Sequence, residues 1–296
     1  MQIKLVKNGI FPVSPGFSCQ KPQTGYSFSG TFQGEGKLLG TPSMFIRLSG
    51  CNLRCSWKAY EGSYSFCDTP YSSHHIDETE DREIHEIVNI VSKNLNGIRH
   101  IIISGGEPML QANALTGLCR ELKAMNLHIT LETNGTIFSH ELVPYIDLFS
   151  ISPKLSNSTP DESKIAAMKK PISEGFISHH QQNRMNIQAI QKFIDACYLP
   201  EDYYSDHPEK ILKRRSDKDF QLKFVVGRPE DEDEIRNEFL KHLKGFEPED
   251  IFLMPLGETR EFLRKTYPLV AEIALRNRWK FTPRLHIELY DDTQWV

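Results

Sequence analysis

Apolar residues recur along this chain with two alternating periods. Short apolar runs typical of buried strands occupy residues 44–48, 100–104, 128–132, 148–152, 220–226 and 251–254. Segments with apolar residues three or four apart, a spacing typical of amphipathic helices, occupy residues 83–95, 110–125, 140–145, 230–243 and 261–278. We expect Pro268 to break the last helix and a final strand to run over 284–289. This alternation predicts an α/β fold with a parallel sheet and right-handed crossovers.

Two stretches do not follow this alternation. Residues 7–30 are rich in Gly, Pro, Ser and aromatic residues and predict an irregular N-terminal extension. Residues 155–219 contain several prolines, one predicted helix at 186–196 and a basic run at 210–215. For so short a run we expect a solvated face rather than contact with an anion or RNA. We treat residues 155–219 as an insertion in a single domain that spans residues 1–296.

Polar or glycine-containing segments directly follow five of the predicted strands. They are Gly50-Cys51, Gly105-Gly106-Glu107-Pro108, Thr133-Asn134-Gly135, Ser152-Pro153-Lys154 and Met254-Pro255-Leu256-Gly257. In parallel α/β folds, functional residues gather at the carboxyl ends of the strands. We therefore expect one active site along this rim of the sheet.

Three of the six cysteines, Cys51, Cys55 and Cys67, lie close together in the sequence. Without residues 58–66, which contain no Cys or His, their spacing is C-x3-C-x2-C. We expect residues 58–66 to be a surface loop that can be removed without loss of a metal site. Three thiolates can hold three irons of a [4Fe–4S] cluster and leave the fourth iron open, as catalytic metal sites require. Buried structural cysteines and a zinc site completed by His74 or His75 are the alternatives, and the cysteines alone do not separate iron from zinc.

Composition limits the remaining possibilities. With 296 residues, 39% of them hydrophobic, the chain can bury a sizeable core. A net charge of −4 argues against a dedicated nucleic-acid surface. The sequence has neither the ~18-residue apolar run of a membrane span nor the h-region of a signal peptide. The cysteine usage indicates a reducing, cytoplasmic location, with Cys19, Cys119 and Cys197 unpaired and structural.

A C-x3-C-x2-C motif followed by Gly105-Gly106-Glu107-Pro108 resembles the radical S-adenosylmethionine superfamily. The resemblance implies a partial parallel β/α barrel and a [4Fe–4S] cluster on Cys51, Cys55 and Cys67. In that superfamily, S-adenosylmethionine binds the open iron, and an electron from the cluster cleaves it to methionine and a 5′-deoxyadenosyl radical. A flavodoxin or a ferredoxin would supply the electron.

Further motifs resemble one family within this superfamily, the 7-carboxy-7-deazaguanine synthases. They lie at residues 32–36 (FQGEG), 45–55 (FIRLSGCNLRC), 67–71 (CDTPY), 103–111 (ISGGEPMLQ), 131–136 (LETNGT), 151–155 (ISPKL) and 283–286 (PRLH). The resemblance implies conversion of 6-carboxy-5,6,7,8-tetrahydropterin to 7-carboxy-7-deazaguanine with loss of ammonia, towards queuosine and related deazapurines. S-adenosylmethionine is regenerated in that reaction, and we expect a homodimer.

The same resemblance implies roles for individual residues. S-adenosylmethionine would contact Gly106, Glu132, Ser152, Pro153, Lys154, Met254, Pro255, Leu256 and Gly257. The substrate would contact Phe32, Gln33, Gly34, Arg47, Ser104, His286 and the C-terminal carboxylate of Val296. Arg47 would grip the pterin carboxylate through two parallel hydrogen bonds. Thr69 would offer its hydroxyl to Mg2+, whose other ligands would be substrate and water oxygens.

Two rival functions share part of this pattern. A glycyl-radical-enzyme activase would have the cysteine cluster and the Gly-Gly-Glu-Pro segment but not the FQGEG and PRLH motifs. A zinc-stabilised binding module would use Cys51, Cys55, Cys67 and His74. The colour of anaerobically purified protein separates iron from zinc, because iron–sulfur proteins are brown and zinc proteins are colourless.

Overall fold

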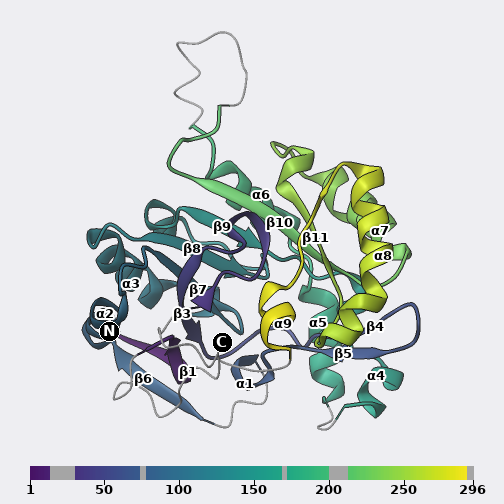
Figure 1. Cartoon of the computed structure of the whole chain (residues 1–296), viewed down its shortest axis with the longest axis horizontal. Helices are drawn as coiled ribbons and strands as arrows, with labels where there is room; N and C mark the ends of the chain where they lie inside the picture. The colour runs from purple at the N-terminus through teal and green to yellow at the C-terminus, as the bar shows by residue number, and fades with distance from the viewer. Residues whose placement is uncertain (14–30, 74–77, 169–171, 200–212, 292–296) are drawn as a thin grey trace.

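The computed structural model describes residues 1–13, 31–73, 78–168, 172–199 and 213–291. Its main feature is a ten-stranded sheet with the strand order β12-β11-β10-β9-β8-β7-β3-β1-β6, in which β2 also pairs with β3 (Figure 1). The strands are β1 (Gln2–Phe11), β2 (Thr31–Phe32), β3 (Pro42–Leu48), β6 (Thr79–Glu83), β7 (His100–Gly105), β8 (His128–Thr133), β9 (Leu148–Ile151), β10 (Asp219–Val226), β11 (Ile251–Pro255) and β12 (Lys280–Phe281).

The pairs from β3 to β12 are all parallel, whereas β1 and β2 run antiparallel to β3 and β6 runs antiparallel to β1. The order ends in β12 on one side and β6 on the other, so within the described residues the sheet is open. The predicted partial parallel β/α barrel is therefore confirmed.

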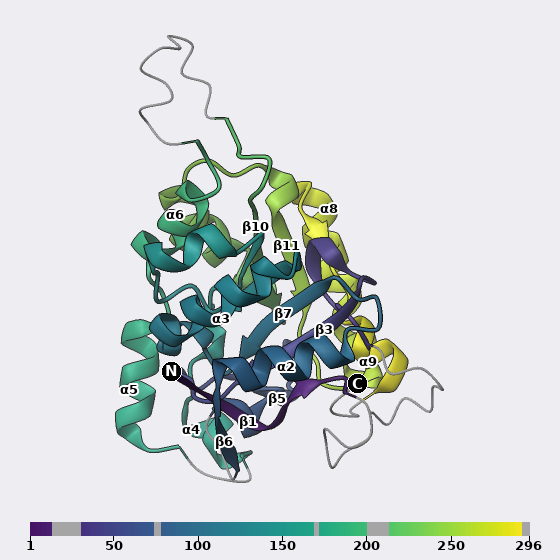
Figure 2. The same ribbon diagram turned by 90° about the vertical axis from the view of Figure 1, so that its left-hand side faces the viewer.

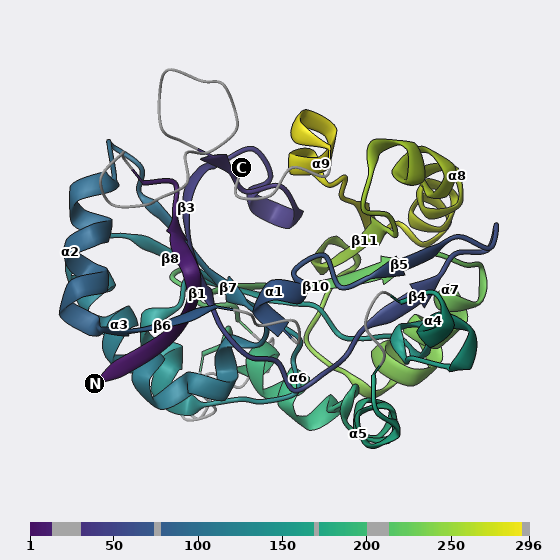
Figure 3. The same cartoon turned by 90° about the horizontal axis from the view of Figure 1, so that it is seen from below.

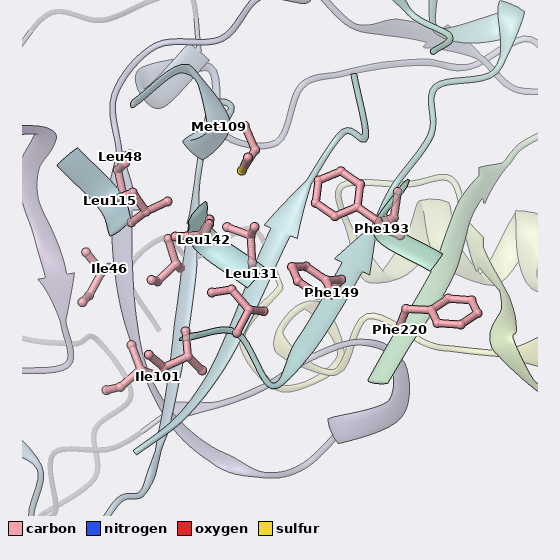
Figure 4. Close-up of a cluster of buried hydrophobic side chains, with 14 of the residues drawn as sticks. Ile46, Leu48, Ile101, Met109, Leu115, Leu131, Leu142, Phe149, Phe193 and Phe220 are labelled. Atoms are coloured by element: carbon pink, nitrogen blue, oxygen red, sulfur yellow. The ribbon is translucent and has the colours of Figure 1, made fainter. Parts of the chain in front are cut away.

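One face of the parallel strands is apolar because it packs in the core. The other face also carries polar side chains such as Ser150, Gln221 and Lys223. Strands β9 and β11 are buried along their whole length. Figure 4 shows Ile46, Ile101, Leu131 and Phe149 from successive strands in one cluster with Phe193 from helix α6 (Ile187–Asp195). Burial of such side chains is the main free-energy gain that holds a parallel sheet together.

Helices α2 (Ile84–Asn94), α3 (Ala112–Ala124) and α6 (Ile187–Asp195) lie along one outer face of the sheet (Figure 2). Helix α8 (Arg260–Asn277) covers β11 and β12 on the opposite flank, and the short helix α1 (Pro70–Ser73) lies between the two flanks (Figure 3). The helices therefore leave the carboxyl ends of the parallel strands free for loops.

Several predicted elements differ from the structure at the two ends of the chain. Residues 284–289, predicted as a strand, lie largely in helix α9 (Leu285–Tyr290); their alternating pattern is too short to specify a strand, and of the apolar residues only Ile287 is buried. Pro268 does not break α8, because its buried residues pack the helix along its length. Residues 7–11 of the expected irregular extension continue β1, and 14–30 lie outside the described residues.

Three further predicted helices contain 3-10 or π-helical turns. Residues 230–243 divide into α7 (Glu230–Glu234), a turn of π-helix (Ile235–Phe239) and the 3-10 helix η7 (Leu240–His242). Residues 140–145 form the 3-10 helix η3 (His140–Tyr145), and the 3-10 helix η2 (Pro108–Gln111) precedes α3. The remaining 3-10 helices are η1 (Gly36–Leu38), η4 (Ser156–Ser158) and η8 (Pro248–Asp250).

The insertion at residues 155–219 contains more structure than the single predicted helix. It forms η4, α4 (Glu162–Ala166), α5 (Glu174–Asn183) and α6, which confirms the predicted helix at 186–196. Residues 169–171 and 200–212 lie outside the described part of the chain. Of the basic run, Arg214 pairs with Asp250 and Arg215 with Asp217. No helix in the described ranges has the length and apolar character needed to cross a bilayer.

The buried imidazole of His100, the first residue of β7, should make the free energy of unfolding sensitive to acid. It is 4% exposed, and its Nδ1 and Nε2 each lie 2.7 Å from a hydroxyl, of Ser43 and Thr130. Burial, with a smaller effect of His128, lowers the pKa of His100 to about 3. Below about pH 6.5 the unfolded chain binds a proton at this histidine and the folded chain does not. The free energy of unfolding therefore decreases as the pH is lowered.

We therefore expect the free energy of unfolding to drop between pH 7 and pH 5, with about 2 kcal/mol of the drop due to His100. The His100→Asn variant should show a drop smaller by that amount in urea titrations at the two pH values. Equal drops in the two proteins would contradict a neutral, buried His100.

Candidate active site

A cavity of about 580 Å³ lies at the carboxyl ends of the parallel strands. Its volume is in the range of small-molecule sites. Sixteen residues predicted from the sequence to bind a metal, a cofactor or the substrate line it: Phe32, Gln33, Gly34, Arg47, Cys51, Cys55, Cys67, Thr69, Ser104, Gly106, Glu132, Ser152, Lys154, Met254, Leu256 and His286. The fold thus brings together residues from widely separated motifs.

The other predicted site residues do not line this cavity. Pro153, Pro255 and Gly257 are adjacent to lining residues, and the Gly257 carbonyl accepts a hydrogen bond from Arg284 Nη1 at 2.7 Å. Val296 and the alternative ligands His74 and His75 lie outside the described residues.

The three clustered cysteines lie on one loop that follows β3, residues 49–73, here called the cysteine loop. Burial raises the pKa of Cys51 to about 12 and raises those of Cys55 and Cys67. The thiols are therefore neutral without a metal, and metal binding must release their protons.

The donor set fits a cluster better than a single ion. Within the ranges that the structure describes, no three His, Cys, Asp or Glu side chains are placed to hold one metal ion. Cys51, Cys55 and Cys67 nevertheless face the same cavity and influence one another electrostatically. Sulfurs spread around one cavity fit a [4Fe–4S] cluster, in which each thiolate binds a different iron.

Residues 58–66 are not a free surface loop. Strands β4 (Ser56–Lys58) and β5 (Tyr64–Phe66) form a hairpin beside α8 (Figures 1 and 3). Trp57 and Ala59 pack with Leu53, Cys55 and Leu256 in one apolar cluster. The hairpin is also fixed by two hydrogen bonds from its backbone amides, from Tyr60 N–H to Gly227 O and from Phe66 N–H to the side-chain Oε1 of Glu258. This packing argues against the expectation that residues 58–66 can be removed without effect on the metal site.

Gly105 and Gly106 allow the end of β7 to meet the cysteine loop. Gly106 N–H donates to Leu48 O at 3.2 Å, and Glu107 N–H donates to Gly50 O at 2.7 Å. A Cβ on Gly106 would lie 2.2 Å from Gly50 O. Gly105 has φ +149°, where a side chain is strained, and its Cβ would lie 2.2 Å from Leu48 O. Both glycines are therefore required by close backbone contact at the edge of the cavity.

Glu107 has a structural role at this edge. Its side chain is fully buried and accepts hydrogen bonds from Met109 N–H at 2.9 Å, Thr133 Oγ1 at 2.8 Å and Asn134 N–H at 2.7 Å. It therefore ties the loop after β7 to the loop after β8. The Asn134 side chain in turn donates to Asn52 of the cysteine loop at 2.9 Å.

Arg47, near the end of β3, presents its guanidinium to the cavity. The guanidinium carbon lies 5.4 Å from the ring centre of Phe11 and 5.8 Å from that of Tyr71. Its Nε is buried, and among the described residues it has no hydrogen-bond partner. A buried guanidinium donor without a partner is costly, so this geometry suits an anionic ligand.

A buried ionic network forms another wall of the cavity. Arg284 pairs with Asp68 and donates to Glu35 Oε1 at 3.2 Å, and Lys223 pairs with the same Glu35. Burial alone would raise the pKa of Glu35, but Lys223 and Arg284 outweigh it and hold this pKa well below its usual range. These four residues are therefore charged at neutral pH and fix the FQGEG segment against the loop that precedes α9.

Three predicted substrate residues lie next to this network. Gln33 donates from Nε2 to Glu132 Oε1 at 3.1 Å. A Cβ on Gly34 would lie 2.3 Å from His286 Nδ1, so only glycine allows this approach. Burial, then Arg284, lowers the pKa of His286 to about 4. The imidazole is neutral at pH 7 and can both donate and accept a hydrogen bond.

Sequence reasoning assigned no role to five residues that organise this site: Glu35, Asp68, Glu107, Lys223 and Arg284. Four of them lie inside the motifs described above, directly beside residues that were given roles. Lys223 was detectable as a charged residue within the apolar run 220–226, because buried lysines are rare unless they are paired.

A family model and two relatives indicate where this chain belongs. The model of the radical SAM superfamily matches residues 45–165. A 7-carboxy-7-deazaguanine synthase of Halobacterium salinarum is 36% identical over 270 residues, 88% of this chain and 88% of that protein. A protein of the same name from Rhodopirellula baltica is 31% identical over 258 residues, 87% of this chain and 82% of that protein.

A solved structure gives independent information on the fold. QueE from Escherichia coli superposes with a TM-score of 0.59 and covers 96% of this chain and 95% of that chain, at 20% sequence identity. This similarity supports the partial barrel described above.

Proposed function

This chain belongs to the 7-carboxy-7-deazaguanine synthase family of the radical SAM superfamily, and from that membership we propose its reaction. It converts 6-carboxy-5,6,7,8-tetrahydropterin to 7-carboxy-7-deazaguanine with loss of ammonia, in the biosynthesis of queuosine and related 7-deazapurines. The observation in this molecule that carries the proposal is Arg47, whose buried Nε has no hydrogen-bond partner among the described residues, in a cavity that the three cysteines also line.

At the cofactor end, the residues of the cavity fall into two groups, cluster ligands and contacts to S-adenosylmethionine. Cys51, Cys55 and Cys67 would hold three irons of a [4Fe–4S] cluster, and Gly106, Glu132, Ser152 and Lys154 would surround S-adenosylmethionine, with Met254 and Leu256 against it. When bound, the cluster supplies the electron that cleaves S-adenosylmethionine and starts the radical chemistry. The apolar cluster of Leu53, Trp57 and Ala59 would exclude water from this end of the cavity.

The substrate end of the cavity is polar and held in place. Arg47 would grip the pterin carboxylate through two hydrogen bonds, while Phe32, Gln33, Gly34, Ser104 and His286 surround the ring. We retain the C-terminal carboxylate of Val296 as a further contact. These assignments require the pterin to occupy the part of the cavity bounded by the ionic network of Arg284 and Glu35.

An anaerobic assay tests the reaction directly. Reconstituted protein is incubated with dithionite, S-adenosylmethionine and the carboxytetrahydropterin, and the products are identified by mass spectrometry. We expect 7-carboxy-7-deazaguanine to accumulate while the total amount of S-adenosylmethionine stays constant. Reductive cleavage of S-adenosylmethionine without this product would contradict the proposed substrate.

Replacing Arg47 should separate substrate binding from cofactor cleavage. Loss of one partner of a buried ion pair costs about 3–5 kcal/mol, so kcat/KM for the pterin should fall by about two to four powers of ten in Arg47→Ala. Slow, uncoupled cleavage of S-adenosylmethionine should remain. Arg47→Lys, which keeps the charge but not the two parallel donors, should show an intermediate loss. An unchanged substrate affinity in Arg47→Ala would remove Arg47 from the site.

We also propose that Thr69 binds Mg2+ together with substrate and water oxygens. Its side chain lines the cavity, with Oγ1 3.6 Å from Cys67 Sγ. The stimulation of turnover by Mg2+ should be weaker in Thr69→Ala and largely kept in Thr69→Ser, which retains the hydroxyl. The same Mg2+ dependence in Thr69→Ala and the wild type would mean that Thr69 only shapes the turn before α1.

Further proposals concern the molecule as a whole. Residues 1–296 form a single domain, supported by one apolar cluster that contains residues from β1 to α8. The protein acts in the cytoplasm as a homodimer and receives electrons from a flavodoxin or a ferredoxin. The free thiols of the described cysteines support a reducing compartment.

A further inference from the structure

Helix α5, part of the insertion at residues 155–219, contacts two loops of the active-site rim. Phe176 and His180 within the helix and Arg184 at its C-cap are spaced four residues apart and therefore share one helix face. The first two contact Arg54 of the cysteine loop, and the third contacts Lys154, in the loop after β9. One face of an inserted helix thus connects the proposed cluster ligands with the proposed S-adenosylmethionine site.

Arg54 closes the turn between Cys51 and Cys55. Its Nη1 donates to Cys51 O at 2.8 Å and to Leu53 O at 2.9 Å. Its guanidinium carbon lies 4.3 Å from the ring centre of Phe176, a distance at which a cation and an aromatic face attract each other. The side chain of Arg54 therefore binds the turn on one side and helix α5 on the other.

His180 binds the backbone of the same turn. Arg54 N–H donates to His180 Nδ1 at 3.0 Å, and His180 Nε2 lies 3.0 Å from Ser158 Oγ. Ser158 Oγ donates to Leu155 O at 2.7 Å, so its oxygen is left to accept. Nε2 must then carry the ring proton, and Nδ1 is the acceptor. The ring is fully buried, and burial lowers the pKa of His180 to about 3, which keeps it neutral.

Arg184 completes the connection on the side of the cofactor. Its Nη1 donates to Lys154 O at 2.9 Å and to Glu234 Oε1 at 2.8 Å. Leu155, at the far end of the His180 and Ser158 chain, is the residue next to Lys154. The turn of the cysteine loop and the loop after β9 are therefore joined twice through α5.

We propose that His180 is a positioning residue, which holds the turn between Cys51 and Cys55 at a fixed place relative to residues 152–154. Without the acceptor on the fully buried His180, the amide of Arg54 has no partner, and the turn must move to satisfy it. The displacement would fall on Cys55, the next residue. This inference rests on the proposed function only in that the three cysteines hold a cluster.

Two substitutions of similar size and polarity test this role. In His180→Asn, the amide oxygen lies near the position of Nδ1 and can still accept from Arg54. In His180→Gln, the amide lies near the position of Nε2 and can bind only Ser158. The measurements are the rate of iron release to a chelator from anaerobically reconstituted protein, and the EPR spectrum of the reduced cluster with and without S-adenosylmethionine.

We expect His180→Asn to release iron within about twofold of the wild-type rate and His180→Gln to release it about tenfold faster, the effect of one lost buried hydrogen bond. The change of the EPR spectrum on addition of S-adenosylmethionine should be kept in His180→Asn and reduced in His180→Gln. If His180 acts only through its hydrogen bond to Ser158, His180→Gln should instead release iron near the wild-type rate and His180→Asn should release it faster. That order, or equal rates in the two variants, would overturn the proposal.

Ser158→Ala provides a second test that leaves Nδ1 in place, and it should release iron more slowly than His180→Gln. Release as fast as that of His180→Gln would also overturn the proposal. A wild-type protein that binds no iron would instead contradict the proposed function.

Discussion

Replacing Cys55 with alanine should abolish the iron–sulfur cluster, which is the largest single effect expected in this protein. Cys55 lines the cavity together with Cys51 and Cys67, and two thiolates leave two irons without a protein ligand. The anaerobically reconstituted variant should be colourless, and iron and sulfide analysis should find no cluster. Cys51→Ala and Cys67→Ala should behave in the same way.

Cys119→Ala and Cys197→Ala are the matched controls for this experiment. Both thiols are fully buried in the hydrophobic core, beside the sheet rather than in the cavity. These variants should keep the brown chromophore. A loss of iron in Cys119→Ala as complete as that in Cys55→Ala would show that the ligand assignment is wrong.

Replacing Arg284 with methionine should cause the largest loss of stability. Arg284 is 6% exposed and neutralises both Glu35 and Asp68. Removing Arg284 takes away the partner of Asp68 and leaves Glu35 with Lys223 alone, and breaking a buried ionic group in this way costs about 3–5 kcal/mol. Urea unfolding of the metal-free protein at pH 7 should report this loss.

Arg276→Met is the control, because Arg276 also binds two carboxylates, those of Glu232 and Glu272, but its side chain is 54% exposed. Exposed pairs contribute at most about 1 kcal/mol. Adding Asp68→Asn to Arg284→Met should recover part of the lost stability, because it removes the carboxylate that has lost its partner. Equal stability losses in Arg284→Met and Arg276→Met would mean that the network of Arg284 does not behave as a buried one.

The parallel sheet and its active edge were predictable because their signals are local. An apolar run such as 100–104 identifies a strand by itself, and the glycines that follow it mark the close backbone contact seen at Gly106. In a parallel sheet, such strand ends must lie on one edge. The cavity could therefore be expected from the order of motifs along the chain, before any contact between them was known.

The contacts that cross from one motif to another were not predictable in this way. Glu35 and Arg284 are separated by 249 positions, and no spacing rule relates them. The sequence predicts a loop where β4 and β5 form a hairpin, because strands of only three residues are too short to show a period. His180 lies in an insertion, where the motifs gave no guide to function.

The hydrogen bonds around Glu107 have a consequence for ligand affinity. They join the loops after β3, β7 and β8 to one another, through Gly50, Asn134 and Asn52. Ordering a mobile loop on binding subtracts from affinity, whereas a preorganised loop does not. The chain's own hydrogen bonds therefore order this edge of the cavity, so that less of the free energy of ligand contacts made there is lost to ordering the loops.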